Sequence, residues 1–173
     1  MSYNQPIATS SDYGIVKLGT TPGAADAGYF YSTQTQTNSA SPNIVTMNGT
    51  GLSQGITLVG GTKLTVSKGG NYNLSIMIQF TKSTSAGGNA QGFFWLRKNG
   101  INIADSSSDC TTGTVTQGVI ASWTYILPLV AGDYLEMAWI SASTNAILIA
   151  TPATAGPPVI PANPSVRMTL LQV

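Results

Sequence analysis

Residues 70–80 read Gly-Asn-Tyr-Asn-Leu-Ser-Ile-Met-Ile-Gln-Phe, and this stretch decides the fold class. Apolar side chains occupy every second position of it: Tyr72, Leu74, Ile76, Ile78 and Phe80. A period of two places successive side chains on opposite faces of a β-strand. The stretch therefore predicts a strand with one face on a hydrophobic core and the other face mostly polar.

Further strand signals follow toward the C-terminus. Gly92–Lys98 contains four consecutive apolar residues, and the Asn99-Gly100 pair after it is a strong hairpin signal because both residues tolerate positive φ. We expect other strands over residues 101–104, 119–127, 134–140, 145–150 and 166–173. Pro128–Asp133 is expected to turn the chain, and Pro152–Pro164 to form a loop. No segment of a dozen residues keeps apolar positions at the helical spacing of 3.6. About eight strands from residue 56 onward predict an all-β fold, an antiparallel β-sandwich of the jelly-roll type.

The N-terminal part of the chain has a different pattern. Tyr13–Leu18 could form one short strand, and Tyr29–Thr37 alternates aromatic and polar residues as a peripheral strand would. Without a second apolar layer, residues 1–50 are expected to form an extended arm that anchors the protein, and residues 51–173 to form the jelly-roll domain. The apolar residues that would contact a partner's exposed sheet edge are Tyr3, Ile7, Tyr13, Ile15, Val16 and Leu18. Two alternatives stay open: the arm packs back on its own assembly, or it swaps between protomers.

Three of the expected strands are apolar on both faces. Phe93 and Trp95 face opposite to Phe94 and Leu96, and the segments 119–127 and 134–140 are similarly two-sided. An antiparallel sandwich covers only one face of each sheet, so the second face needs cover from outside the protomer or from the arm and long loops. We expect a homo-oligomer, specifically a trimer. Its predicted interface residues are Phe93, Trp95, Tyr125, Tyr134 and Ile140.

Composition excludes several classes of function. Charged residues make up 8% of the 173 residues, against roughly 25% in an average soluble protein. The seven basic residues form no cluster for a phosphate backbone, so we expect no nucleic-acid binding. No apolar run is long enough to span a bilayer, and the first residues do not resemble a secretion signal. An extracellular composition without an export signal suggests release by lysis, although non-classical export would leave the same pattern.

The residues needed for catalysis are scarce. The chain contains no histidine, which is the usual general base for a serine or cysteine nucleophile. Asp105 and Asp109 lack the spacing of a calcium loop, and Asp133 is expected to stabilise a turn by accepting hydrogen bonds from backbone N–H groups. Cys110 is the single cysteine, so it has no intrachain disulfide partner. We therefore expect no enzymatic activity, no catalytic residues, no cofactor and no metal site.

Three segments together resemble a known superfamily. They are Gly70-Asn71-Tyr72, Leu96-Arg97-Lys98-Asn99-Gly100 and Leu129-Val130-Ala131-Gly132-Asp133-Tyr134-Leu135. In the same order, the tumour-necrosis-factor-like and complement-globular-head superfamily carries a Gly-x-Tyr strand start, a Leu-x-x-Asn-Gly hairpin and a Leu-x-x-Gly-Asp-x-Leu turn. The resemblance covers about residues 56–173 and implies a tumour-necrosis-factor-like jelly roll.

Two further segments, residues 8–19 and residues 161–173, are similar to segments of bacteriophage head-fibre and tail-fibre proteins. This resemblance implies a virion structural protein: a trimeric capsid-decoration or head-fibre protein at the virion surface, made in the host cytoplasm without a signal peptide. Its expected partners are two further copies of itself and the major capsid protein or another virion protein, without membrane insertion. The alternative is the receptor-binding tip of a phage tail fibre, whose partner would be a host surface glycan.

Overall fold

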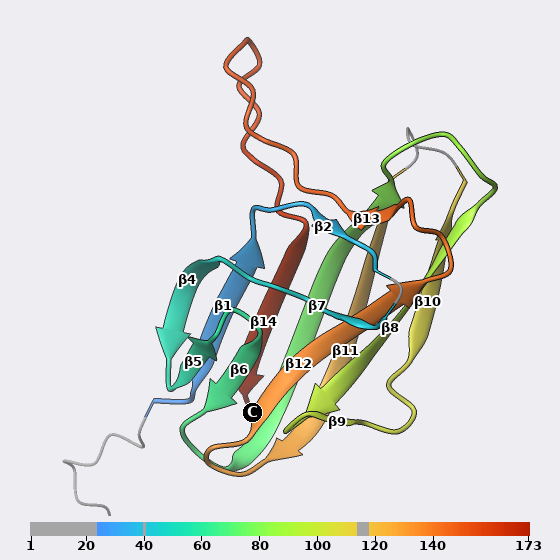
Figure 1. Cartoon of the computed structure of the whole chain (residues 1–173). Helices are drawn as coiled ribbons and strands as arrows, with labels where there is room; N and C mark the ends of the chain where they lie inside the picture. The colour runs from blue at the N-terminus through green and yellow to red at the C-terminus, as the bar shows by residue number, and fades with distance from the viewer. Residues whose placement is uncertain (1–23, 40, 114–117) are drawn as a thin grey trace, which may run out of the picture.

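The computed structural model describes residues 24–39, 41–113 and 118–173, which form two β-sheets packed face to face (Figure 1). The strands are β1 (Ala27–Ser32), β2 (Gln36–Thr37), β3 (Asn43–Ile44), β4 (Gly49–Gln54), β5 (Ile56–Val59), β6 (Lys63–Val66), β7 (Gly70–Lys82), β8 (Ala90–Lys98), β9 (Ile101–Asn102), β10 (Ser108–Thr112), β11 (Val119–Leu129), β12 (Tyr134–Ser141), β13 (Ala146–Leu148) and β14 (Val166–Gln172). Within the described residues, no helix has the length and apolar character to cross a membrane.

Each sheet is assembled from strands that are distant in sequence. Sheet A has the order β2-β13-β7-β14-β1-β4, and β11 pairs with β7 as well. Sheet B has the order β10-β8-β12-β6-β5, with β3 paired to β12 and β9 paired to β8. Every strand pair is antiparallel, and the chain crosses repeatedly between the sheets, for example from β6 to β7, from β7 to β8, from β10 to β11 and from β11 to β12. This order is that of a jelly roll, so the all-β sandwich predicted from the sequence is confirmed.

The core lies between the sheets and follows the alternation seen in the sequence. β7 is the longest strand, and its inward side chains, from Tyr72 to Phe80, are buried. Aromatic rings from both sheets meet at the centre: Phe94 packs edge-on against Phe80 with ring centroids 5.7 Å apart and parallel to Trp139 at 6.1 Å. Gly92 lies beside this cluster, where a Cβ would approach the Phe80 ring to 2.9 Å. The aromatic cluster thus holds the two sheets together through close side-chain packing.

The second half of the expected arm belongs to the sandwich. β1 lies between β14 and β4, and its Phe30 is fully buried opposite Met168. Val45 and Met47 are core residues as well. The prediction of an arm extending to residue 50 is therefore wrong for residues 27–50. The side chains of residues 29–31, Tyr-Phe-Tyr, alternate between the two faces of β1, as in any strand. β1 in turn pairs with the edge of β14. Residues 1–23, with the expected strand Tyr13–Leu18 and all six anchor residues, lie outside the described residues.

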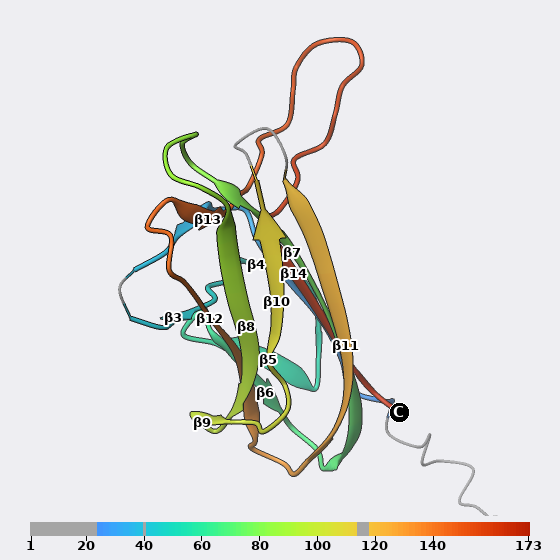
Figure 2. The same cartoon turned by 90° about the vertical axis from the view of Figure 1, so that its right-hand side faces the viewer.

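Other expected elements appear close to their predicted bounds. Asn99 and Gly100 have φ values of 52° and 79°, as the hairpin signal requires. β10 lies outside the strands expected from the sequence, because the segment after Ser106 is mostly polar. Residues 149–165 project from one end of the sandwich as a long loop (Figures 1 and 2). Backbone hydrogen bonds between Thr151 and Asn163 close the base of this loop.

Candidate functional site

The structure distributes the five predicted interface residues over two regions. Phe93 of β8 and Ile140 of β12 are register partners on the outer face of sheet B, and Trp95 follows on the same face. Tyr134 lies at the start of β12, with the Lys63 ammonium 4.7 Å from its ring centroid. Tyr125 instead packs against the core from β11. That these five residues contact other copies of the chain stays a prediction, but they do not form one continuous surface.

The outer face of sheet B is hollowed on both sides of Trp95. One hollow, of about 420 Å³, is lined by Phe93, Trp95, Asn102, Ile103, Asp105 and Ser107. The other, of about 280 Å³, is lined by Pro42, Ile44, Trp95, Arg97, Asn102 and Ala138. Ala138, which helps to line the smaller hollow, lies directly across from Trp95 in the register and is fully buried. Trp95 and Asn102 border both hollows, which places the indole between them.

The loop that borders the larger hollow is held firmly. The buried Ser106 hydroxyl accepts a hydrogen bond from the Leu96 backbone N–H at 3.0 Å and donates one to the Ile103 carbonyl at 2.7 Å. The Tyr125 hydroxyl donates to the Ser106 carbonyl at 3.0 Å. Asp105 has a φ of 58° and is exposed. The loop is thus tied to β8 and to β11 at its midpoint, and residues on either side of that point face the hollow.

Charged side chains of the strands gather on sheet B. Arg97 Nη1 lies 3.5 Å from Glu136 Oε2, and Lys98 Nζ lies 3.1 Å from Asp133 Oδ2. Lys63 of β6 and Asp109 of β10 belong to the same sheet. Asp109 accepts a hydrogen bond from the Gln91 side chain at 2.7 Å.

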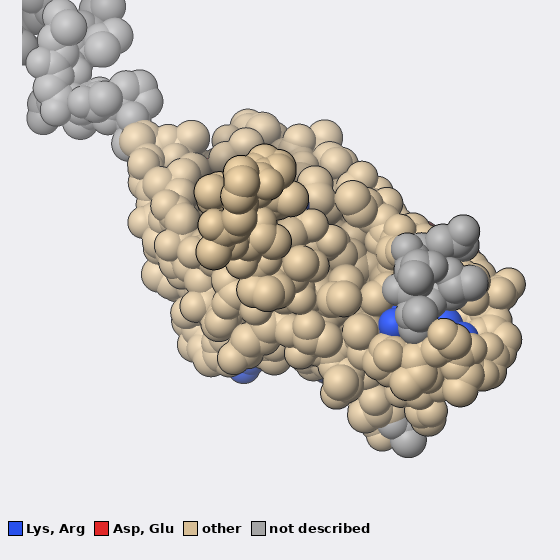
Figure 3. Space-filling view, turned by 90° about the horizontal axis from the view of Figure 1, so that it is seen from above, with Lys and Arg blue, Asp and Glu red and all other residues tan. Residues whose placement is uncertain are grey.

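The outer face of sheet A is nearly free of charge. In its strands β4, β1, β14, β7 and β11 only Arg167 and Lys82 carry charge, and Lys82 is buried. Its ammonium donates to the carbonyls of Gly87 and Gly88 at 2.9 and 2.6 Å. The end of the sandwich that carries the projecting loop is also mostly uncharged, as the view from above in Figure 3 shows. Large apolar side chains are exposed on the outer face of sheet A: Leu52, Met77, Ile120, Ile126 and Leu171.

Register aligns these exposed side chains into rows across sheet A. Leu171 of β14 and Ile126 of β11 both pair with Asn73 of β7, so they flank it in one row. At the other edge, the rings of Tyr29 and Tyr31 lie over Gly51 and Gly49 of β4, where a Cβ would come within 2.5 and 2.2 Å of a ring atom. These two glycines allow the tyrosines to lie flat against the strand. The result is a smooth face of apolar and neutral polar groups.

One long edge of the sandwich is open between β10 and β11. Trp123 and Tyr125 reach inward from β11, and the Trp123 ring lies 5.3 Å from that of Phe94. Both side chains remain partly exposed because the strands facing each other here belong to different sheets. Cys110 of β10 packs at the same edge, and burial together with the nearby Asp109 charge raises its pKa to about 11. At neutral pH Cys110 is therefore a neutral thiol and a weak nucleophile.

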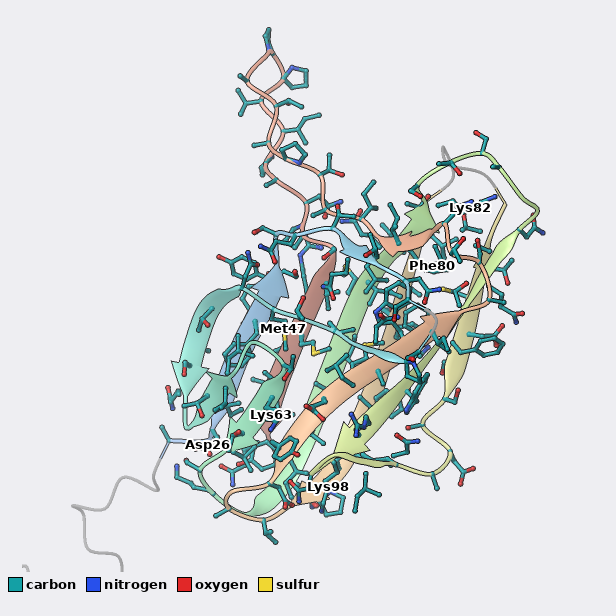
Figure 4. The ribbon with its side chains drawn as sticks, in the orientation of Figure 1. Asp26, Met47, Lys63, Phe80, Lys82 and Lys98 are labelled. Atoms are coloured by element: carbon teal, nitrogen blue, oxygen red, sulfur yellow. The ribbon has the colours of Figure 1, made fainter. Side chains whose placement is uncertain are left out.

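Three buried carboxylates have structural partners: Asp26, Asp133, and Glu136, which is paired with Arg97. Asp26 accepts hydrogen bonds from the Ser67 and Tyr72 hydroxyls at 3.0 and 3.1 Å and lies 3.0 Å from the Lys68 ammonium. Burial opposes ionisation of Asp26, but Lys68 and the two hydroxyl donors outweigh it and lower its pKa. Figure 4 shows Asp26 and Lys98 toward the end of the sandwich opposite the projecting loop.

Asp133 has the role expected from the sequence. Its Oδ2 accepts a hydrogen bond from the Val130 backbone N–H at 3.0 Å, within the turn that links β11 to β12. That bond and one from Asn99 lower the pKa of Asp133, with a smaller contribution from Lys98. Among the described residues, no three His, Cys, Asp or Glu side chains gather as metal ligands would. The buried carboxylates join elements of the fold, and in the described part of the chain they show no arrangement for catalysis.

Comparison of the sequence with protein-family models and with curated proteins gives no match. The fold does have counterparts among solved structures. The globular domain of zebrafish complement 1qA matches with a TM-score of 0.53 at 11% identity, over 86% of this chain and 97% of that one. Murine APRIL at pH 8.0 matches with a TM-score of 0.53 at 11% identity, over 86% and 99%. At such low identity the likeness shows the fold alone, a two-sheet sandwich resembling those of tumour necrosis factor and complement 1q. It gives no support for a phage origin.

Proposed function

We propose that the chain is a non-catalytic structural protein that assembles as a homotrimer and covers the surface of a bacteriophage particle, as a capsid-decoration or head-fibre protein. The observation that carries the self-assembly is the outer face of sheet A, where exposed apolar side chains stand among neutral polar groups. A protein surface of this kind is a site of contact with another protein.

The energetics favour burial of this face. Ile126 is 68% exposed, Ile120 67%, Leu52 46% and Leu171 42%. Removing apolar surface from water stabilises a complex by roughly 25 cal/mol per Å². A stable interface buries roughly 800 Å² per partner and has few charged residues at its centre. Arg167 is the one charged residue of these strands that is not buried, and it already donates to Asn163 Oδ1 at 2.9 Å. Contact with another copy therefore leaves few charges to desolvate.

The distribution of charge orients each protomer in the proposed trimer. Sheet B carries ion pairs and exposed charged groups, which are stable in water. We therefore place sheet A and the open edge with Trp123 and Tyr125 toward the other copies, and sheet B toward solvent. In this arrangement Phe93, Trp95 and Ile140 remain accessible, which differs from the interface predicted from the sequence. The two assignments make opposite predictions for single substitutions.

The placement on a phage particle is supported by sequence. Residues 8–19 and 161–173 are similar to segments of phage fibre proteins, and a chain with only 8% charged residues suits a surface covered by neighbours. In this proposal the N-terminal segment, with Tyr3, Ile7, Tyr13, Ile15, Val16 and Leu18, binds the shell by adding a strand to an exposed sheet edge.

Sedimentation velocity of the purified chain at micromolar concentration tests the assembly. The proposal expects a single trimeric species, and a monomer or a dimer contradicts it. Deletion of residues 2–22, which precede the described part of the chain, tests the anchor. The truncated protein should remain a trimer with an unchanged melting temperature but should no longer bind particles stripped of this protein. Normal binding by the truncated protein would place the anchor elsewhere.

Antibody labelling of purified particles of the phage that encodes the chain tests the location. Labelling at many positions on the head supports a decoration or head-fibre protein. Labelling at the tail tip supports the receptor-binding alternative, and particles without the protein exclude both.

A further inference from the structure

We propose that the outer face of sheet B binds a neutral oligosaccharide, with the Trp95 indole as a stacking surface and the side chains of Asn102 and Asp105 as hydrogen-bonding groups. This site lies on the opposite sheet from the proposed assembly surface. Its test and the test of the trimer can therefore fail independently.

The indole is held in a fixed orientation and has space on both sides. Trp95 Nε1 donates a hydrogen bond to Asn102 Oδ1 at 2.9 Å, which ties the ring to β9. The two hollows of about 420 and 280 Å³ border this ring on its two sides. Small-molecule sites in proteins span roughly 300–1,000 Å³, and together the two hollows fall in this range. A chain of sugar units can place one unit in each hollow with the indole between them.

Polar groups stand at the rim of this aromatic surface. The hydrogen bond from Trp95 uses the oxygen of the Asn102 amide, and its nitrogen donates no hydrogen bond within the described residues. The carboxylate of the exposed Asp105 and the hydroxyl of Ser107 border the larger hollow. An amide N–H donor and a carboxylate acceptor can together bind a pair of neighbouring sugar hydroxyls, each of which both donates and accepts.

The site is formed before any ligand arrives. The Ser106 side chain holds the loop against β8, and the Tyr125 hydroxyl holds it against β11. Asp105 and Ser107 are therefore positioned by their buried neighbour, and little loop ordering is needed on binding. A preformed arrangement of this kind lowers the entropic cost of binding a flexible ligand.

The chemistry of the face favours a neutral sugar. A pyranose presents an apolar C–H surface surrounded by hydroxyl groups, which matches an aromatic ring with polar groups at its edge. Arg97, beside the smaller hollow, lies 3.5 Å from Glu136 and donates to the Gly100 carbonyl. Its charge is thus partly neutralised, so no strong positive potential selects an acidic ligand. A peptide with apolar side chains is the competing ligand, and the experiment separates it from a sugar.

The ligand for the titration is first identified by binding of the protein to an array of immobilised neutral oligosaccharides. Sialylated and sulfated glycans on the same array serve as charged comparators. The best neutral binder is then titrated into ¹⁵N-labelled full-length protein. The chain has three tryptophans, and their indole N–H signals can be assigned with single Trp→Phe variants. We expect the Trp95 indole signal to shift on titration, while the signals of Trp139 in the core and of Trp123 at the open edge shift little.

Substitutions then test the named residues. Trp95→Ala should weaken binding at least tenfold, and Asp105→Asn should weaken it several-fold. Ile101→Ala is the matched control, because Ile101 is 74% exposed and lines neither hollow. It should leave the affinity unchanged, and all three variants should sediment like the wild-type protein.

Four outcomes would overturn the proposal: no binding of any neutral glycan, preferential binding of charged glycans, undiminished binding by Trp95→Ala, or a titration that leaves the Trp95 signal unmoved. Selection of an apolar peptide that shifts the Trp95 signal, with no glycan able to displace it, would also overturn the proposal in favour of a peptide site. If Trp95→Ala fails to fold, the titration of the wild-type protein alone shows whether the ligand binds at Trp95.

Discussion

The side-chain amide of Asn99 donates a hydrogen bond to Asp133 Oδ1 at 2.6 Å, and this contact joins two turns separated by 34 positions in the chain. The Asn99 Oδ1 atom accepts in return from the Tyr134 backbone N–H at 3.0 Å. Asp133 Oδ2 accepts from the Val130 N–H and lies 3.1 Å from the Lys98 ammonium. The Asn-Gly and Gly-Asp segments that resemble the tumour-necrosis-factor-like superfamily are therefore direct partners, which link the end of β8 to the start of β12.

Asn99→Gly tests the contribution of this side chain. Glycine tolerates the positive φ of 52° at this position, so the variant removes the two side-chain hydrogen bonds without adding backbone strain. We expect a loss of about 1–3 kcal/mol in the free energy of unfolding, measured with a chemical denaturant. Asn99→Ala should lose more, because alanine adds strain at positive φ. Equal stability of Asn99→Gly and the wild-type protein would show that the contact contributes nothing.

The lowered pKa of Asp133 predicts how its contribution depends on pH. An unfolded aspartate titrates near pH 3.9, and the folded pKa is lower, so the ionised form is favoured by folding. Its stabilisation is present above about pH 4 and is lost as pH falls through the folded pKa. We expect Asp133→Asn to be less stable than the wild-type protein at pH 7, with the difference shrinking below about pH 4. Denaturant unfolding at pH 7, 4 and 3 measures this, and a difference that grows toward acid would contradict the assignment.

Tyr72 predicts the opposite behaviour at high pH. Burial, together with its hydrogen bond to the negatively charged Asp26, raises its pKa to about 12, whereas an unfolded tyrosine titrates near pH 10. The neutral phenol is favoured by folding, so its stabilisation is complete below pH 10 and is lost as pH rises toward 12. Tyr72→Phe should cost about 1–2 kcal/mol at pH 7, because Asp26 loses a donor. Between pH 10 and pH 11.5 the variant should lose less stability than the wild-type protein, and parallel losses would be evidence against this role.

The fold can be predicted from the sequence where the local spacing of apolar residues agrees with the pattern of burial. The alternation from Tyr72 to Phe80 is directly visible in the sequence because every second residue of β7 faces the core. The absence of a second apolar layer in residues 1–50 predicts an arm there, but β1 obtains its cover from β14, which lies more than 130 residues away. Such non-local pairing is set by which strand edges remain open in the folded sheet. Local composition does not contain that information.

The surfaces were harder to predict than the core. The alternation of Phe93, Phe94, Trp95 and Leu96 correctly separated the buried residues from the outward ones. It could not show that Trp95 stands between two hollows, because these depend on Ala138, Ile44 and the loop after β9. The low charge of sheet A is visible only when distant strands are placed side by side. Nor does the sequence show that the Tyr125 hydroxyl donates to the Ser106 carbonyl within the same chain.

A matched pair of substitutions decides which sheet faces the other copies. Ile126 lies on the outer face of sheet A and is 68% exposed, while Phe93 lies on the outer face of sheet B and is 40% exposed. Neither side chain contributes strongly to the core, so an aspartate at either position should leave the protomer folded. A carboxylate buried at an interface without a partner costs several kcal/mol, which is enough to dissociate a trimer at micromolar concentration.

If sheet A forms the interface, Ile126→Asp should sediment as a monomer and Phe93→Asp as a trimer. Ile126→Thr is the control for Ile126→Asp, because it keeps the β-branched shape without the charge and should remain largely trimeric. Circular dichroism should confirm that all three variants are folded. The reverse result, with Phe93→Asp monomeric and Ile126→Asp trimeric, would restore the interface predicted from the sequence. If both aspartate variants remain trimers, neither face is buried at these positions, and the contact must lie along the open edge, where Trp123→Asp would be the next substitution to separate the copies.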